Sequence, residues 1–208
     1  MRKSRLEAFS DGVIAVIITI IVLELRVPRG ADLASLQDLA APFLSYVLSF
    51  VFIAIYWNNH HHMLHTVERV NGAILWANMH LLFWLSLVPF VTAWMAAHLF
   101  ATWPTILYGL VLIMAAIAYS VLQNAVIHLH GKESILATAI GADLKGKVSI
   151  LFYLVAIAFA FLNTWLSVSL YILVACLWFL PDRRIERQVD RTDAGSDSRA
   201  TSDRPPTT

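Results

Sequence analysis

Charged residues are scarce in this sequence. Of its 208 residues, 14% are Asp, Glu, Lys or Arg, whereas 59% are hydrophobic, and the mean hydropathy is +0.68. Soluble domains carry about 25% charged residues. The net charge of +1 also provides no basic surface for a nucleic acid. The composition therefore excludes an ordinary soluble domain and predicts an integral membrane protein without a nucleic-acid partner.

Cysteine pairs and catalytic motifs are missing as well. The single cysteine, Cys176, excludes a disulfide within one chain and lies in an apolar run, where we expect a small buried hydrophobic side chain. Lys145, Gly146 and Lys147 lack the rest of a phosphate-binding loop, and the chain has no nucleophile elbow. The sequence thus gives little basis for an enzyme.

Long apolar runs dominate what is present. A membrane-spanning helix needs about 20 mostly apolar residues. Six runs approach this length, at residues 6–25, 43–60, 72–96, 104–127, 147–163 and 165–180. Asn163 and Thr164 alone separate the last two, which predicts a tight helical hairpin. We expect an all-α domain of six transmembrane helices over residues 1–180 and a polar, disordered tail over residues 181–208.

Lysine and arginine are distributed unevenly between the connecting segments. If the N-terminus is cytoplasmic, the outside loops hold only Arg26 and Arg29, and every other basic residue lies inside. The positive-inside rule favours this orientation. We therefore expect a multi-pass protein of the cell membrane with both termini in the cytoplasm.

In the first apolar run, Ser10 and Asp11 point away from a stripe of mainly apolar residues around Val16. At about 100° per residue, Ser10 lies about 120° and Asp11 about 140° from Val16, in opposite directions. A carboxylate in the bilayer costs about 2.5–3.5 kcal/mol unless it is paired or hydrated. If the stripe around Val16 faces a pore, Asp11 is predicted to be buried against neighbouring helices. That stripe contains Phe9, Gly12, Val16, Thr19, Ile20 and Leu23.

Partners for Asp11 are expected near the cytoplasmic ends of the next two helices. Because successive helices alternate in direction, the polar residues of WNNHHHMLH and LWANMHLLFW should lie on the same side of the membrane as Asp11. We expect a hydrogen-bonded network there. The candidates are His60, His61, His62, His65, Asn78 and His80.

The histidines allow a second interpretation. His61, His65 and Glu68 stand at i, i+4 and i+7, which places them on one face of a helix and is typical of a site for a metal with two histidines and one carboxylate. The zinc-protease motif H-E-x-x-H is not matched, because His62 occupies its second position. We favour a hydrogen-bonded or solvated cluster, which makes pH sensitivity an expectation, and predict no bound metal.

The first helix contains the element Arg5-x-x-x-Phe9-Ser10-Asp11, followed by apolar residues up to Thr19 and by Leu23-Glu24-Leu25. This element resembles the first helix of the bacterial relatives of the endolysosomal potassium channel, transmembrane protein 175. Trp57-x-x-His60-His61, Asn78 and Pro89 are similar to later landmarks of that family.

This resemblance implies a passive, modestly potassium-selective cation channel, with potassium as the permeant species and no cofactor. It implies a homotetramer in the lipid bilayer whose pore is lined by the first helix of each chain. The family's constrictions stand five, nine and twelve residues after the aspartate, at Val16, Ile20 and Leu23, which all fall on the stripe described above. Apolar rings of this kind select ions through pore diameter and dewetting.

Two interpretations remain open for each of three polar residues of this helix. We interpret Asp11 as a structural anchor, with Ser10, Arg5 and a histidine or Asn78 as partners. The alternative is a direct role in gating or proton sensing. The Thr19 hydroxyl either contacts the ion or bonds back to a carbonyl one turn earlier. Glu24 either concentrates cations at the outer mouth or is simply solvated at the helix end.

A different class of function also remains open. The cluster from His60 to His65 would suit a membrane transporter, or a small membrane protein that binds a metal or carries out redox chemistry. Transporters are often built from inverted repeats and broken helices. The sequence shows no such repeat, and only Pro89 in the third run indicates a break.

Overall fold

The computed structural model describes residues 2–28, 30–131, 133–140 and 143–179, and in this part of the chain every regular element is a helix. The predicted all-α fold is therefore confirmed, while the tail predicted at residues 181–208 lies outside the described residues. The elements are α1 (Lys3–Leu23), η1 (Ala34–Leu39), α2 (Ala40–His65), α3 (Gly72–Ser86), α4 (Val88–Ala97), α5 (Thr102–His130), α6 (Ile135–Ile140), α7 (Leu144–Ala160) and α8 (Thr164–Phe179).

Each of the predicted apolar runs is helical, and the third is broken into α3 and α4. Asn71 caps the start of α3, where its side chain accepts a hydrogen bond of 2.9 Å from the Ile74 N–H. Pro89 lacks an N–H and its ring would clash with a carbonyl of the preceding turn, so α3 ends at Ser86 and α4 begins at Val88. The hairpin predicted at Asn163 is confirmed between α7 and α8.

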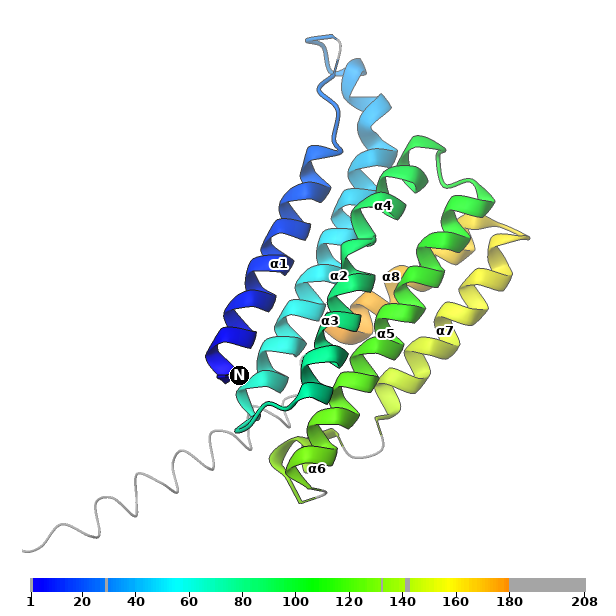
Figure 1. Cartoon of the computed structure of the whole chain (residues 1–208). Helices are drawn as coiled ribbons and strands as arrows, with labels where there is room; N and C mark the ends of the chain where they lie inside the picture. Colours follow the sequence, from blue (N-terminus) through cyan, green and yellow to red (C-terminus); the bar gives the residue numbers. More distant parts are fainter. Residues whose placement is uncertain (1, 29, 132, 141–142, 180–208) are drawn as a thin grey trace, which may run out of the picture.

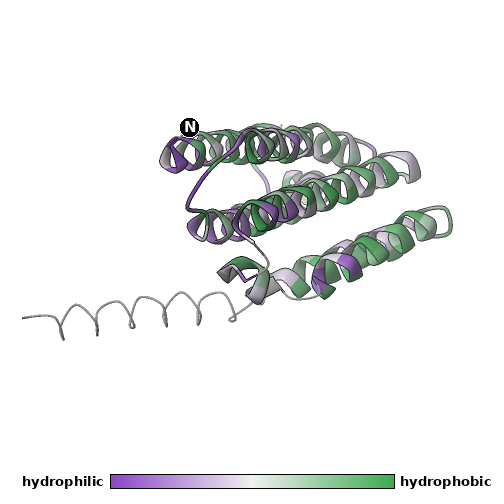
Figure 2. Cartoon of the chain, turned by 60° about the horizontal axis from the view of Figure 1, so that its bottom comes forward, coloured by the Kyte–Doolittle hydropathy of each residue, from purple (hydrophilic) through white to green (hydrophobic). Residues whose placement is uncertain are grey.

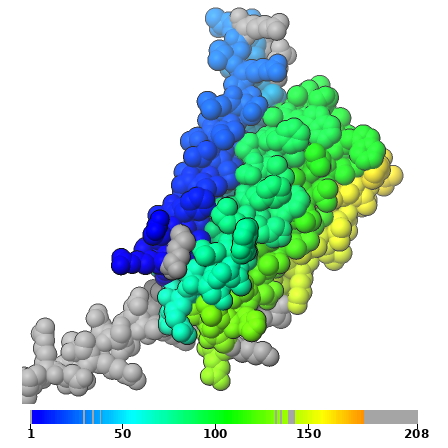
Figure 3. All heavy atoms as spheres, in the orientation of Figure 1, coloured from blue at the N-terminus to red at the C-terminus, as the bar shows by residue number. Residues whose placement is uncertain are grey.

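The long helices run alternately up and down between two ends of the molecule, and α3 and α4 together make one of these passes (Figure 1). α1 lies at one edge, where it packs against α2, α3 and α4, and the α7–α8 hairpin lies at the other edge, where α7 packs against α5. In the space-filling view α1 runs as a strip along the edge of the subunit (Figure 3). The first helix thus lies at the margin of the helix bundle, with one side packed on its neighbours.

Four helical segments of the described chain are long and apolar enough to cross a membrane, namely α1, α2, the α3–α4 pair and α5. α7 and α8 are shorter, with 17 and 16 residues. The bodies of the helices are mainly hydrophobic, while hydrophilic residues gather at the start of α1 and in the loop after α2 (Figure 2). This distribution is that of a multi-pass membrane protein.

The loop between α2 and α3 is fastened to the end of α5. The His130 Nε2 atom accepts hydrogen bonds from the backbone N–H groups of Glu68 (3.1 Å) and Arg69 (3.3 Å). The other ring nitrogen, Nδ1, lies 2.9 Å from the Val126 carbonyl oxygen, to which it donates when Nε2 accepts. α5 ends at His130, and the next residue, Gly131, has a φ of 91°, which suits a residue without a side chain. These contacts fix where the chain turns after α2.

The prediction for Cys176 is wrong, because this side chain is exposed on α8. The inner face of α8 instead carries Ser167, Val168, Tyr171, Val174 and Ala175. In a helix that is apolar on all sides, hydrophobicity does not distinguish the face toward the core from the face toward lipid.

Candidate functional site

The two faces of α1 differ sharply in burial. The predicted stripe is exposed in the subunit: the exposed fractions are 48% for Phe9, 56% for Val16, 40% for Ile20 and 79% for Leu23. Gly12 and Thr19 are exposed as well. The opposite face is buried against α2, α3 and α4, and it consists of Leu6, Ser10, Ile14, Ile17 and Ile21.

A chain of hydrogen bonds links the buried face of α1 to α3 and α2. The Asn78 amide nitrogen donates to Ser10 Oγ (2.9 Å), and Asn78 Oδ1 lies 2.7 Å from His60 Nε2. Ser10 Oγ donates in turn to the Leu6 carbonyl at 2.8 Å. Because an amide oxygen only accepts, Nε2 of His60 carries the proton. All three side chains are at most 1% exposed. These hydrogen bonds connect three of the candidate residues, Ser10, His60 and Asn78, which we name the core triad, while Asp11 has a different partner.

A second row of polar side chains lies between α1 and α2 and reaches the surface. Three residues of α1, four apart, face three residues of α2, also four apart, and the two helices run in opposite directions. Side chains at this spacing share one side of a helix. We name this row the α1–α2 seam; it consists of Lys3, Glu7 and Asp11 on α1 and of Trp57, His61 and His65 on α2.

Hydrogen bonds, a ring stack and charged contacts join the two helices along the seam. The Trp57 indole N–H donates to Asp11 Oδ1 at 2.9 Å, and the Trp57 ring stacks on His61 with 5.7 Å between ring centroids. Glu7 Oε1 lies 3.6 Å from His61 Nδ1 and 3.9 Å from His65 Nε2. At the end of the row, Lys3 Nζ donates to the His65 carbonyl oxygen at 2.8 Å. The seam thus joins the first turns of α1 to the last turns of α2.

The partners predicted for Asp11 are wrong in detail. The carboxylate is half-buried, and its partner is Trp57 rather than Ser10, Asn78 or a histidine. Ser10 and Asp11 are neighbours in sequence and therefore lie about 100° apart around α1. The hydroxyl consequently points into the subunit toward Asn78, while the carboxylate lies beside α2. Arg5 is exposed, about 120° from Asp11 around the helix.

The prediction that His61, His65 and Glu68 share one helical face is wrong for Glu68. α2 ends at His65, so the helical spacing no longer applies three residues later. Glu7 of α1 takes the place beside the two histidines, although the sequence analysis did not single it out. Its position one turn before Asp11, on a helix antiparallel to α2, is the signal that would have found it. His80 lies elsewhere, and its Nε2 accepts from Trp84 Nε1 at 2.9 Å.

Substitutions at the Asp11–Trp57 contact test whether Asp11 is an anchor. Asp11→Ala and Trp57→Phe each remove the same hydrogen bond, so each is expected to lower the free energy of unfolding in detergent by about 1 kcal/mol. Because one bond is lost only once, the double variant should be destabilised by less than the sum of the two single variants. Stability unchanged in Asp11→Ala, together with an altered voltage or pH dependence of ion flux, would instead support a role in gating.

The far end of α1 carries the remaining predicted residues. The Thr19 hydroxyl donates to the Val16 carbonyl oxygen at 2.8 Å, one turn earlier. Glu24 is exposed at the C-terminal cap of α1. It lines a groove toward α4 together with Arg26, Tyr46 and Phe90. The carboxylate therefore stands in an open position where α1 ends, at a groove lined mainly by apolar side chains.

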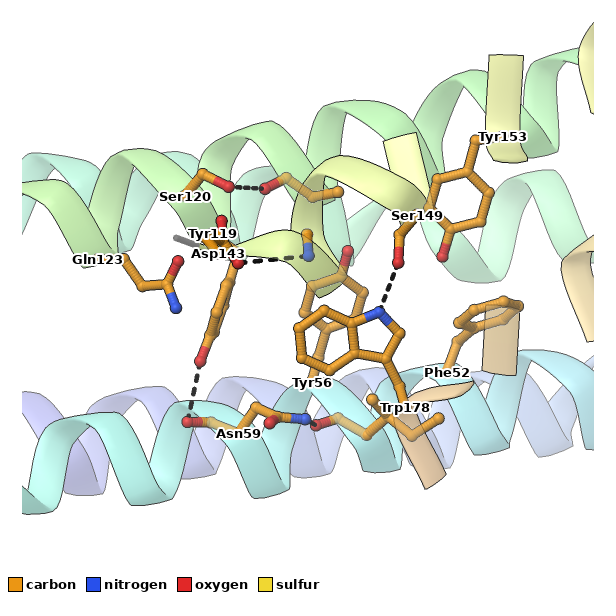
Figure 4. Close-up of a pocket in the computed structure, with 13 residues that line it drawn as sticks. Phe52, Tyr56, Asn59, Tyr119, Ser120, Gln123, Asp143, Ser149, Tyr153 and Trp178 are labelled. Carbon is orange, nitrogen blue, oxygen red and sulfur yellow. Dashed lines mark hydrogen bonds between the residues drawn. The ribbon is translucent and has the colours of Figure 1, made fainter. Parts of the chain in front are cut away.

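A separate pocket lies between α2, α5, α7 and α8 (Figure 4). Its polar groups already hold one another: the Tyr119 hydroxyl donates to the Asn59 carbonyl oxygen (3.1 Å), and Trp178 Nε1 donates to Ser149 Oγ (2.7 Å). Burial raises the pKa of the Asp143 carboxyl, which precedes α7, above its ordinary value, against a hydrogen bond from the Gly146 N–H. None of the described lining residues belongs to α1, so this pocket is distinct from the exposed stripe.

Comparison with known proteins identifies the family. The family model described as the endosomal/lysosomal potassium channel TMEM175 matches residues 5–89, the stretch that contains the core triad and all of the α1–α2 seam except Lys3. A potassium channel of Chryseobacterium sp. (strain P1-3) is 52% identical over 91% of this chain and 98% of its own length. The chain belongs to the TMEM175 family.

Further members agree in fold and extend the range of similarity. The crystal structure of a lysosomal potassium-selective channel TMEM175 homolog from Chamaesiphon minutus is 32% identical, covers 86% of this chain and 97% of its own, and superposes with a TM-score of 0.76. The human endosomal/lysosomal proton channel TMEM175 is 31% identical over 86 residues, which cover 36% of this chain and 17% of the human protein. These relatives are channels, in agreement with the expectation that the chain is not an enzyme.

Proposed function

We propose that this protein is a passive cation channel of the cell membrane that prefers potassium. The observation that carries the proposal is the exposed stripe of α1, on which Val16, Ile20 and Leu23 leave large apolar side chains uncovered in the subunit. Its relatives from Chryseobacterium and Chamaesiphon are named as potassium channels. Conduction through such a pore follows the ion gradient without an energy source.

The pore is enclosed by a homotetramer. One helix per chain does not surround an ion path, so copies of α1 from several subunits must face a common axis. α1 lies at the edge of the subunit with its opposite face already packed on α2, α3 and α4, which leaves the stripe for the axis (Figure 3). The resemblance to the family supports four copies. Phe9 and Gly12 then line the approach to the narrow part of the pore.

The narrow part consists of apolar rings. Val16 and Ile20 are one turn apart, and Leu23 lies three residues further, which spaces the rings by about 6 Å and about 4.5 Å along the pore. Such rings do not replace an ion's hydration shell, so they select by diameter and by the free energy of wetting. Valine is smaller than isoleucine or leucine, which makes the ring at Val16 wider. A modest rather than strict preference for potassium follows.

Thr19 supplies a polar contact between these rings. Its hydroxyl hydrogen is donated to the Val16 carbonyl, so the lone pairs of the exposed oxygen remain for a cation. The back-bonded state and the ion contact are therefore compatible in one side chain. Glu24, one residue beyond Leu23, attracts cations to the outer mouth.

We further propose that the channel domain of residues 1–180 crosses the membrane six times, with both termini in the cytoplasm. α7 and α8 approach the lower limit of about 17 residues for a spanning helix. They form an antiparallel hairpin that packs against α5, and they continue the alternating chain direction of the longer helices. Lys3, Arg5 and Arg69 lie at the end of the subunit that this topology places inside, whereas Arg26 lies at the other.

The direct test is flux through the purified protein in liposomes under a potassium gradient, with sodium as the competing ion. We expect potassium-preferring flux that needs no second gradient and no nucleotide. A pH-sensitive dye in the same vesicles reports whether protons also permeate. This measurement is relevant because the human relative is named a proton channel. Absence of flux at every voltage and pH, or flux that depends on a second ion gradient, would contradict the proposal.

A further inference from the structure

Glu7, His61 and His65 form a compact group of metal-binding side chains at the inner end of the α1–α2 seam. One potential ligand atom from each residue lies within 4.8 Å of the other two. Two of these distances are shorter still, at 3.6 Å and 3.9 Å from Glu7 Oε1 to the two histidine nitrogens. Three protein ligands with room for a fourth are the arrangement of an open site for a transition metal.

The geometry of the group suits a first-row metal ion. Ligands at about 2.0–2.2 Å in a tetrahedron lie about 3.3–3.6 Å from each other. The contact between Glu7 and His61 already has this length. The His65 nitrogen lies 3.9 Å from Glu7 Oε1 and within 4.8 Å of the His61 ligand atom, and the His65 side chain, 57% exposed, has space to move closer to both. The His61 Nδ1 atom is buried and has no hydrogen-bond partner among the described residues. It therefore offers an unused lone pair or proton toward Glu7.

The neighbouring residues hold the group in place. The His61 ring is stacked on Trp57, and Trp57 is fixed by its hydrogen bond to Asp11. His65 meets His61 edge to face, with 4.6 Å between ring centroids. Partners of this kind orient histidine ligands and sustain affinity.

We propose that Glu7, His61 and His65 bind a divalent first-row transition-metal cation such as Zn²⁺, which fastens the start of α1 to the end of α2. Two imidazoles and one carboxylate favour such ions over Mg²⁺ or Ca²⁺, which prefer oxygen ligands alone. Glu68, which stands at helical spacing in the sequence, takes no part. The consequence for conduction, that a bound metal holds the pore helix in its present position, rests on the proposed function; the binding itself does not.

The binding is tested on the full chain, purified in detergent and stripped of metal with a chelator. Equilibrium dialysis against ZnCl₂ should show one Zn²⁺ per chain, and the bound metal should raise the midpoint of thermal unfolding. Glu7→Gln and His61→Ala should each weaken binding by more than the roughly 10- to 100-fold that the loss of an outer partner costs. His62→Ala and Glu68→Gln are matched controls, adjacent in sequence but outside the group, and should bind as the wild type does.

The outcomes separate the proposal from its alternatives. Equal Zn²⁺ binding by the wild type and His61→Ala, unchanged binding in Glu7→Gln, or loss of binding in Glu68→Gln would each overturn it. Competition by millimolar MgCl₂ would also overturn it, because a site of oxygen ligands would then be responsible. Since dialysis and unfolding require no ion flux, a channel that conducts but binds no Zn²⁺, or the reverse, distinguishes failure of this proposal from failure of the proposed function.

Discussion

Replacement of Asn78 by leucine is expected to destabilise the folded subunit by about 2 kcal/mol. Asn78 is completely buried and is the middle member of the core triad. Its loss leaves the His60 Nε2–H without an acceptor and removes the donor to Ser10, and one buried unsatisfied group costs about 1–3 kcal/mol. Interhelical hydrogen bonds in membranes average only about 0.6 kcal/mol. The orphaned histidine, not the lost bond itself, therefore dominates the effect.

The measurement is reversible unfolding in mixed micelles of the wild type and the variant. Asn124→Leu, on the exposed side of α5, is the control for the change of side chain and should shift stability little. The double variant His60→Leu/Asn78→Leu leaves no orphaned imidazole, so it should be destabilised by less than the sum of the two single variants. Strictly additive effects would show that the triad is not a coupled unit.

The general architecture could be predicted from the sequence because membrane helices follow from the length of apolar runs. The break at Pro89 and the hairpin at Asn163 are local backbone effects, and both were found where the residue types placed them. The periodicity of α1 also separated its exposed face from the face that carries Ser10. Where an apolar run contains few polar residues, their angular position is informative.

The polar contacts between helices were predicted less well, since periodicity describes one helix and not the side from which its neighbour approaches. Asp11 lies at the margin of the buried face, so its partner depended on whether α2 or α3 was adjacent. The prediction for Glu68 is wrong for another reason. Its spacing assumed a helix that continues past His65, but α2 ends there, and the Glu68 backbone N–H donates to His130 instead. Cys176 shows that faces toward lipid and core look alike.

Replacement of Leu23 or Ile20 by asparagine is expected to raise cation flux by about tenfold or more and to reduce the preference for potassium. In the proposed tetramer each substitution places a ring of amides where a ring of alkyl side chains kept water out. A tenfold change corresponds to a barrier lower by only about 1.4 kcal/mol. A ring of polar side chains binds water in the constriction, which an apolar ring does not. This hydration is sufficient to lower the barrier by that amount. The measurement is liposome flux with potassium and sodium, normalised to the amount of reconstituted protein.

Val22→Asn is the matched control for this experiment. Val22 is 43% exposed, much like Ile20 at 40%, but lies about 120° from Val16 around α1, outside the stripe. If the stripe lines the pore, an amide at Ile20 gains water from the conducting path, whereas an amide at Val22 leaves flux per inserted protein unchanged. If instead the stripe faces lipid, Ile20→Asn and Val22→Asn should behave alike, with reduced insertion and unchanged permeability ratios. Exposure in the single subunit is nearly equal at Val22 and Ile20, so only the angular position around α1 distinguishes the two outcomes.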